Sequence, residues 1–280
     1  MCIRTALVFP LIGLLAGCAS LGDAYRRGQA HAAAGRWDAA ITAYYAAAQA
    51  QPDRAEVQQA LSRALEAEGE HEEAFRAQER AHALAPGDMD VTRRLADLYV
   101  QRGRRYLEAG KPSDAFTAWQ RALELAPDHA EARAALAALH REQGEPEQAQ
   151  RHFRQLVESQ PTNGEAHRSL GLTLYKQGKL SEAIFHFQQL VRLQPEDATA
   201  YNNLGSAYLK AGQLDAALTA FEQAAALDPK LAAVHNNWGT ACFQQGRYGR
   251  ARREWTLALS LDADNETARR NLETLEALGY

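Results

Sequence analysis

Seven glycines recur at nearly constant intervals, and each is followed five residues later by an alanine. The glycines are Gly35, Gly69, Gly110, Gly144, Gly178, Gly212 and Gly246. Six of them are followed by a proline seventeen residues later, and successive glycines lie 34 residues apart, except for one interval of 41. Glycine permits a tight turn, and proline ends a helix. The period predicts a stack of small helical units, because one such unit cannot bury its apolar face alone.

The clearest copies carry bulky, small and aromatic residues at set offsets. One reads Tyr201-x-x-Leu204-Gly205-x-x-Tyr208, then Ala217-x-x-x-Phe221, then Pro229. The next reads His235-x-x-Trp238-Gly239-x-x-Cys242, then Ala251-x-x-x-Trp255. This pattern resembles the tetratricopeptide repeat (TPR), whose unit is a pair of helices. The resemblance implies an all-α fold: a right-handed superhelical solenoid of seven TPR helix pairs with a C-terminal capping helix.

The repeats and their flanks predict four segments along the chain. A signal peptide is expected at 1–17, a lipid-anchored cysteine with a short tether at 18–23, TPR repeats over 24–265 and a capping helix at 266–280. The repeats are expected at about 21–54, 55–88, 96–129, 130–163, 164–197, 198–231 and 232–265. The capping helix has Leu272, Leu275 and Leu278 on its apolar face.

The single long interval adds seven residues before the third repeat, and two overlapping frames fit there, with Gly103 or Gly110 as the turn glycine. Seven residues make about two helical turns, so the apolar face returns nearly to phase. We therefore expect a first helix lengthened by two turns near residues 90–109. Two interpretations are open, a tolerated insertion or a protruding contact element, and we favour the insertion.

The N-terminal residues resemble a bacterial export signal followed by a lipoprotein box. The apolar run over residues 6–15 is much shorter than the ~20 residues that a membrane-spanning helix needs. The residues Leu15-Ala16-Gly17-Cys18 then carry the resemblance to the box. It implies cleavage before Cys18 and attachment of acyl chains such as palmitate, which would hold the chain on a membrane. Ala19 in place of Asp favours the outer membrane of a Gram-negative host, with the protein facing the periplasm.

Charge and motif content argue against several classes of function. Without residues 1–17 the chain has 30 Lys and Arg against 35 Asp and Glu, so no general attraction to nucleic acid is expected. Only Cys242 would remain as a free thiol, which excludes an internal disulfide. His152 and His186 recur at the repeat period, but side chains on neighbouring helices of this kind are too far apart to ligate one metal without further ligands. We expect no enzyme activity, no metal and no cofactor.

In TPR superhelices the first helix of each pair lines a concave wall, and that resemblance assigns candidate binding residues here. They are Asn202, Asn203, Asn236, Asn237 and Asn271, with Tyr175, Leu209 and Phe243 as an apolar row beside them. An Asn amide both donates and accepts, so it can pair with any peptide backbone. The series resembles the peptide-gripping Asn ladder of the O-linked glycosyltransferase TPR superhelix. It is equally explained as TPR consensus without a binding role.

The function that these features favour is a lipid-anchored periplasmic scaffold that assembles or localises envelope machinery. It would bind a protein partner or an extended peptide, in the manner of TPR lipoproteins that serve pilus assembly or gather peptidoglycan enzymes. The alternative is the TPR binding component of a polysaccharide-export or glycosyltransferase system. No motif identifies the pathway.

Overall fold

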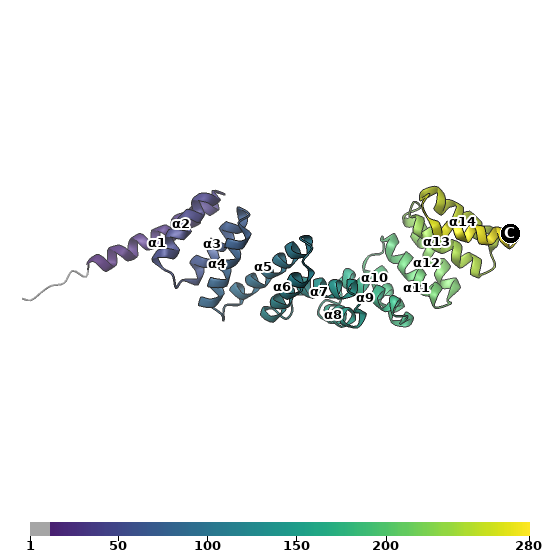
Figure 1. Ribbon diagram of the computed structural model, residues 1–280, viewed down its shortest axis with the longest axis horizontal. Helices are drawn as coiled ribbons and strands as arrows, with labels where there is room; N and C mark the ends of the chain where they lie inside the picture. Colours follow the sequence, from purple (N-terminus) through teal and green to yellow (C-terminus); the bar gives the residue numbers. More distant parts are fainter. Residues whose placement is uncertain (1–11) are drawn as a thin grey trace, which may run out of the picture. The chain divides into compact units, whose positions relative to one another are not determined.

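The computed structural model describes the backbone of residues 12–280 and the side chains from residue 23 onward. This part of the chain forms fifteen α-helices and no strand (Figure 1). The helices are α1(Ile12–Ala33), α2(Trp37–Ala50), α3(Ala55–Ala67), α4(His71–Leu84), α5(Met89–Glu108), α6(Pro112–Leu125), α7(Ala130–Glu142), α8(Pro146–Ser159), α9(Gly164–Lys176), α10(Leu180–Leu193), α11(Ala198–Lys210), α12(Leu214–Leu227), α13(Ala232–Gln244), α14(Tyr248–Leu261) and α15(Glu266–Ala277). The predicted all-α fold is confirmed.

The chain divides into two compact units, Met1–Ala132 and Arg133–Tyr280, and α7 crosses the boundary. Within each unit the helices follow one another as stacked pairs joined by short turns (Figure 1). The second helix of every pair has 14 residues. The first helices α3, α7, α9, α11 and α13 each have 13. The chain therefore repeats the same local structure with little variation.

The turn between the two helices of a pair depends on the periodic glycine. Gly212 has a φ of +74°, in the left-handed region that side chains avoid. Around it, Gly212 N donates to Leu209 O at 3.0 Å, and Gln213 N donates to Tyr208 O at 2.9 Å. This pair of bonds is the Schellman motif, which satisfies the last carbonyls of α11 and reverses the chain.

A second glycine position sets how closely the two helices of a pair approach. A Cβ placed on Gly205 in α11 would lie 2.6 Å from the ring of Phe221 in α12. The same contact occurs at Gly28 with Tyr44, Gly103 with Trp119, Gly171 with Phe187, and Gly239 with Trp255. In every case the aromatic residue follows its glycine by sixteen positions. The aromatic ring thus packs directly on the backbone of the first helix.

The helix α5 has 20 residues and lies where the lengthened helix was expected. Gly103 sits within α5 against Trp119, and Gly110 has the positive φ of the turn, so the second of the two frames is the one adopted. The added turns pack inward: Val91 and Leu95 are buried, and Gln78 Nε2 in α4 donates to Val91 O at 2.9 Å. The extra turns are therefore part of the core, as a tolerated insertion would be, and they do not protrude.

The helix α1 differs from the expected N-terminal tether. It begins at Ile12 and continues without a break through residues 18–23, where a short non-helical tether was predicted. This run has no proline after residue 10 and is rich in Ala and Leu, which favour helix. Residues 1–11 and the side chain of Cys18 lie outside the described part, so the signal and lipidation assignments stay predictions. Among the described residues, none of the helices has the length and apolarity to cross a bilayer.

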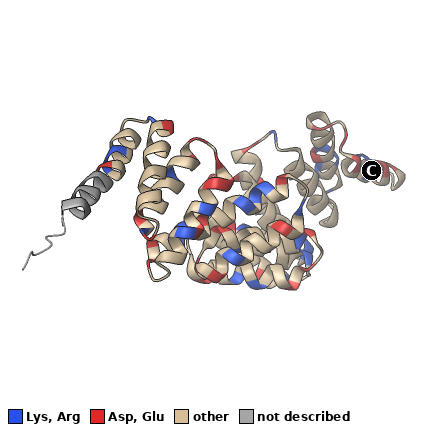
Figure 2. Cartoon of the chain, turned by 60° about the vertical axis from the view of Figure 1, so that its left-hand side comes forward, with Lys and Arg blue, Asp and Glu red and all other residues tan. Residues whose placement is uncertain are grey.

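Charged residues of both signs are spread over the helices (Figure 2). The turn between α3 and α4 is an acidic cluster of Glu66, Glu68, Glu70, Glu72 and Glu73, and the helix α5 partly neutralises it. Arg102 Nη2 contacts Glu72 Oε2 at 2.9 Å, and Arg94 pairs with Glu66. These ion pairs join α5 to the preceding repeat. They give part of the acidic cluster a role within the protein, so no external binding partner is needed to explain it.

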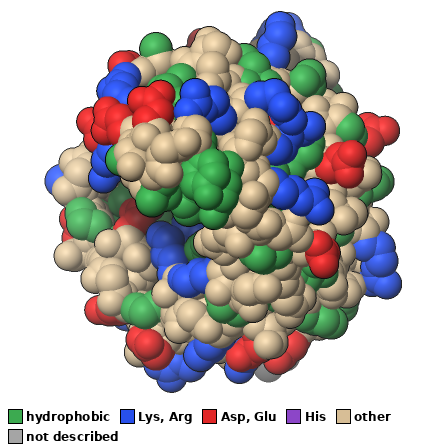
Figure 3. Space-filling model, turned by 90° about the vertical axis from the view of Figure 1, so that its right-hand side faces the viewer, with side chains coloured by type: hydrophobic (Ala, Val, Ile, Leu, Met, Phe, Trp, Pro, Cys, Tyr) green, Lys and Arg blue, Asp and Glu red, His purple; other side chains and the backbone are tan. Residues whose placement is uncertain are grey.

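The last helix, α15, covers one end of the C-terminal unit. Leu275 and Ala268 are buried, Leu272 is half-buried, and Leu278 is 56% exposed. The prediction that all three leucines form the apolar face is thus wrong for Leu278, because the helix ends at Ala277. On the face drawn in Figure 3, apolar side chains form separate patches among charged ones, as expected of a surface in contact with water.

The packing at Gly205 predicts a position-specific cost of adding a methyl group. Gly205→Ala should lower the free energy of unfolding by about 1–3 kcal/mol, because the ring of Phe221 must move. Gly249→Ala in α14 is the matched control: its Cβ would meet nothing within 4 Å, and alanine favours helix by about 0.5–1 kcal/mol. Urea unfolding followed by circular dichroism measures both. Equal effects of the two variants would refute the close-packing account.

Candidate functional site

The first helices of the C-terminal unit form a continuous wall. α9 contacts α11, α11 contacts α13 and α13 contacts α15, in addition to the contacts within each pair. Second helices pack on the first helix of the next repeat, as α10 does on α11 and α12 on α13. Corresponding positions of α9, α11, α13 and α15 therefore recur side by side along one face. This face, the first-helix wall, carries every binding residue proposed from the sequence.

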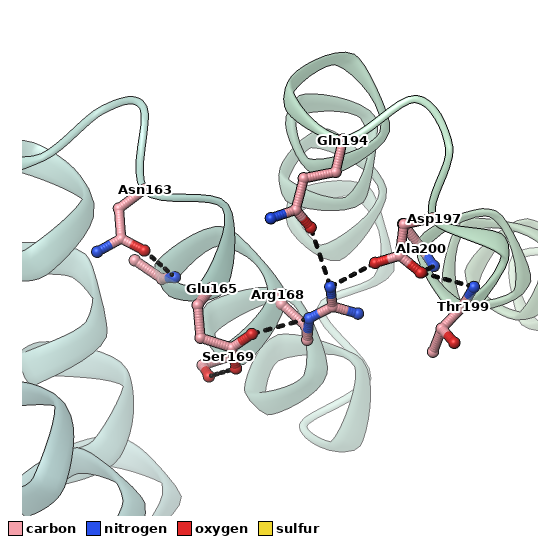
Figure 4. Close-up of polar contacts among 9 residues, drawn as sticks. Asn163, Glu165, Arg168, Ser169, Gln194, Asp197, Thr199 and Ala200 are labelled. Atoms are coloured by element: carbon pink, nitrogen blue, oxygen red, sulfur yellow. Dashed lines mark hydrogen bonds and ion pairs between the residues drawn. The ribbon is translucent and has the colours of Figure 1, made fainter.

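Arg168 joins α9 to the next repeat at the start of the wall (Figure 4). Its Nη2 donates to Asp197 Oδ2 at 2.5 Å and to Gln194 Oε1 at 3.1 Å, and its Nε donates to Glu165 Oε2 at 3.0 Å. Asp197 in turn caps α11, because its Oδ1 accepts from the N–H groups of Thr199 and Ala200. One guanidinium thus fixes the loop between α10 and α11 against α9.

These contacts lower the pKa of the Asp197 carboxyl. Burial raises the pKa, but the hydrogen bond from Arg168 and those from the capping N–H groups of Ala200 and Thr199 outweigh it. The net pKa lies below its usual value, so the carboxylate stays ionised. The sequence-based search missed Arg168. The sequence does contain a signal for this residue. Arg168 lies 34 residues before Asn202 and 68 before Asn236, so it holds the same repeat position as these two predicted binding residues.

Two of the predicted amides bind each other across the wall. Asn237 Nδ2 in α13 donates to Asn202 Oδ1 at 3.0 Å and also lies 3.3 Å from Ser206 Oγ in α11. Asn236 Nδ2 contacts Asn237 Oδ1 at 3.4 Å. Asn202 and Asn237 thus use part of their hydrogen-bonding capacity within the protein, and their role in binding stays a prediction. The two amides meet because the fifth position of one repeat faces the sixth position of the next.

The remaining predicted amides are Asn203 and Asn271. Both are half-buried on the wall, and neither side chain has a hydrogen bond to any residue that the structure describes. Each retains two donors and an acceptor for another molecule. Of the five predicted amides, Asn202 and Asn237 thus join repeats, Asn236 contacts Asn237 within α13, and Asn203 and Asn271 are available.

The predicted apolar row is half-buried rather than open. Tyr175 packs on the core around Leu174 and Phe187, and Lys210 Nζ lies 4.5 Å from the centre of its ring. Leu209 packs on the core cluster around Phe221. Phe243 lies 5.4 Å from Tyr248 and 5.7 Å from Trp255, measured between ring centroids. Each residue supplies both core contact and an exposed edge, so the row offers a narrow apolar strip along the wall.

Histidine and cysteine side chains have structural surroundings. His186 and His152 each contact a histidine of their own repeat: His186 Nδ1 lies 3.0 Å from His167 Nδ1, and the His152 ring stacks on His140. Burial, with a smaller effect of His167, lowers the pKa of His186 to about 4. Burial likewise raises the pKa of the Cys242 thiol, which disfavours the reactive thiolate. No cluster with metal-ligand geometry occurs among the described residues.

The fold and the wall define an α-helical repeat protein with a binding face. A model of the tetratricopeptide repeat family matches residues 25–88, 174–232 and 202–266, which is more than half of the chain. The chain belongs to the TPR family, whose members are typically interaction scaffolds. A model described as the TPR domain of cytochrome c-type biogenesis protein H matches residues 100–201. No curated protein sequence matches the chain significantly.

Solved structures of TPR proteins are similar to this one. YrrB, described as a TPR protein with an unusual peptide-binding site, is 21% identical, with a TM-score of 0.60, over 70% of this chain and 98% of its own. MamA from Desulfovibrio magneticus RS-1 is 24% identical, with a TM-score of 0.57, over 61% and 96%. PilF of Pseudomonas aeruginosa is 25% identical, with a TM-score of 0.52, over 68% and 93%. At this level of identity, YrrB and MamA support the fold alone.

The Arg168–Asp197 contact should be a stronger coupling than an exposed ion pair between repeats. In a double-mutant cycle with Arg168→Gln and Asp197→Asn, which keeps a capping oxygen, we expect a coupling of about 1 kcal/mol. The exposed pair Arg154–Glu182 is the control, since its side chains are 47% exposed against 20% and 25% here. That control should give less than about 0.5 kcal/mol.

The same pair predicts the direction of the pH dependence. Because the pKa of Asp197 is lowered in the fold, its contribution is fully present above the carboxyl's unfolded pKa and is lost as pH falls through the lower value. Unfolding curves of the wild type and Asp197→Asn across the acid range measure this. Parallel pH profiles for the two proteins would contradict the assignment.

Proposed function

We propose that this protein is a lipid-anchored periplasmic scaffold whose first-helix wall binds an extended peptide segment of a protein partner. One observation carries the binding role. Two amides without a hydrogen bond to a described residue, Asn203 and Asn271, lie on the same wall as a half-exposed apolar strip. An extended backbone presents alternating donors and acceptors, which amides can match whatever the peptide's side chains. The apolar strip would supply contact area beside them.

The wall is suited to this role because its polar contacts already fix the spacing of the helices. Asn202, Asn237 and Arg168 join successive repeats, so the available amides are held on a supported surface. A preformed surface loses less conformational entropy on binding than a flexible one. Binding should therefore leave the helix positions largely unchanged.

The anchoring part of the proposal rests on the sequence around Cys18. The apolar run followed by Leu15-Ala16-Gly17-Cys18 resembles a lipoprotein signal. Acyl chains bind a bilayer with about 0.8 kcal/mol per buried methylene, so several chains would anchor the protein stably. The helix α1 begins before Cys18 and would place the first repeat close to the membrane surface.

Two matches bear on the process that the scaffold serves. The envelope-assembly role rests on the lipoprotein-like sequence around Cys18, and the chain is also similar to PilF of Pseudomonas aeruginosa. The family match over residues 100–201 favours a second candidate function, a part in cytochrome c biogenesis. The polysaccharide-export alternative rests only on the resemblance of the Asn ladder. Crosslinking in intact cells, followed by identification of the attached proteins, separates these processes.

Replacing the proposed lipidated residue tests the anchor. Cys18→Ser should abolish acylation and release the protein from the membrane fraction, because serine lacks the thiol that is modified. Cys2→Ser is the matched control and should leave fractionation unchanged, since that residue is removed with the signal. Mass spectrometry of the N-terminal peptide and membrane fractionation provide the readout. An acylated, membrane-bound Cys18→Ser protein would contradict the anchor.

Replacing the available amides tests the binding face. Peptides are selected with purified full-length protein from a displayed library of random dodecapeptides, and their affinities are measured by fluorescence anisotropy. Asn203→Ala with Asn271→Ala should weaken binding by about 1–3 kcal/mol, at about 0.5–1.5 kcal/mol for each lost bond. The melting temperature should not change, because neither amide bonds a described residue.

Asn202→Ala is the contrasting variant. It removes a bond between α11 and α13, so it should lower the melting temperature as well. Unchanged affinity in the Asn203 and Asn271 double variant, with an intact fold, would show that these amides are TPR consensus without a binding role.

A further inference from the structure

A cavity opens at the end of the wall between the fourth and fifth repeats. Its volume is about 490 Å³, and its lining includes Arg141, Glu147, Thr173, Lys176, Gln177 and Lys179. Arg141 precedes Tyr175 by 34 residues, and Lys176 precedes Lys210 by 34. Arg141 and Lys176 thus hold, one repeat earlier, the same positions as Tyr175 of the apolar row and Lys210 beside it. A peptide lying along the wall would reach the cavity.

The cavity carries an excess of positive charge. Three of its side chains are basic and one, Glu147, is acidic. Lys179 Nζ donates to the neutral Gln150 Oε1 at 2.7 Å, and Arg141 lies over the Phe153 ring at 5.9 Å. Within the described chain, none of the three basic groups forms an ion pair with a carboxylate. A recess with unpaired cations attracts an anionic group.

The amide of Gln177, beside the cavity, differs from its equivalent in a later repeat. Both of its polar side-chain atoms are buried, and neither has a hydrogen bond to a described residue. Two repeats later the equivalent residue, Gln245, donates through Nε2 to Asp215 Oδ1 at 2.5 Å. Asp215 corresponds in turn to Glu147. The bond that Gln245 makes to Asp215 between the sixth and seventh repeats is therefore not made by Gln177 and Glu147 between the fourth and fifth, where the cavity lies.

We propose that this cavity receives a carboxylate of the bound peptide, held by Lys176, Lys179 and Arg141. The proposal rests on the peptide-binding function proposed above. A singly charged carboxylate suits the site better than a dianionic phosphate, because Glu147 belongs to the same lining. The carboxylate can come from an Asp or Glu side chain or from the C-terminus of the peptide.

The two sources are separated by the form of the peptide library. Purified full-length protein is used to select from random dodecapeptides displayed either with a free C-terminus or within a longer chain. A side-chain carboxylate predicts enrichment of Asp or Glu at one position in both libraries. A terminal carboxylate predicts enrichment only in the library with free C-termini.

Variants at Lys176 test the site itself. Lys176 is exposed and has no ion pair among the described residues, so replacing it should leave the melting temperature unchanged. Lys176→Gln should weaken binding of an acidic peptide about two- to fivefold, and Lys176→Glu should weaken it further. The same peptide with Gln in place of its acidic residue should not respond. Lys230→Gln, at an exposed lysine outside the cavity, is the control.

The outcomes distinguish this inference from the function on which it rests. Selected peptides without an acidic preference, or acidic peptides that bind Lys176→Glu and Lys179→Gln as tightly as the wild type, would overturn the carboxylate site alone. Failure to select any peptide, or selected peptides that ignore the loss of Asn203 and Asn271, would overturn the binding function and this site with it.

Discussion

The close contact between a glycine in the first helix and an aromatic ring in the second determines the geometry of this protein. At Gly205 the Phe221 ring lies where a Cβ would be, and four other repeats have the same contact. Because the ring packs directly on the glycine backbone, no side chain of the first helix stands between the two helices, and they approach closely. The short glycine turn then fixes the direction of the second helix. Helix pairs with the same geometry contact their neighbours through corresponding faces, and the first helices of the C-terminal unit therefore form a continuous wall.

The polar contacts between repeats depend on that spacing. Arg168 reaches Asp197 and Gln194 because α9 and the loop before α11 are held at hydrogen-bond distance. Asn237 reaches Asn202 for the same reason one repeat later. Such contacts add about 0.5–1.5 kcal/mol each, less than the core packing, but they determine which wall residues stay free for a ligand. Some asparagines of the wall therefore stabilise the stack of repeats, and others remain available to bind a ligand.

The insertion in α5 shows how the repeat tolerates an irregularity. Seven added residues return the apolar face nearly to phase, so Val91 and Leu95 enter the core beside α4. The cost of a longer helix is offset by this burial and by the ion pairs of Arg94 and Arg102. An insertion that did not match a whole number of helical turns would have turned polar residues inward. The irregularity is accommodated because its length matches the helical period.

The sequence by itself determined the helix pairs, their turns, their number and the small residue at each close approach. These features depend on contacts at constant separation along the chain, and a period in the sequence reports such contacts directly. Only the tertiary structure decided that the turns added to α5 pack inward, and that Asn202 and Asn237 bind each other while Asn203 and Asn271 do not. It also decided that the amide nitrogen of Gln245 has a hydrogen-bond partner and that of Gln177 has none among the described residues. Equivalent positions in a repeat have the same backbone, but the partner of a polar side chain lies on another helix. That partner depends on side-chain length, rotamer and charge in the neighbouring repeat, which the period does not encode.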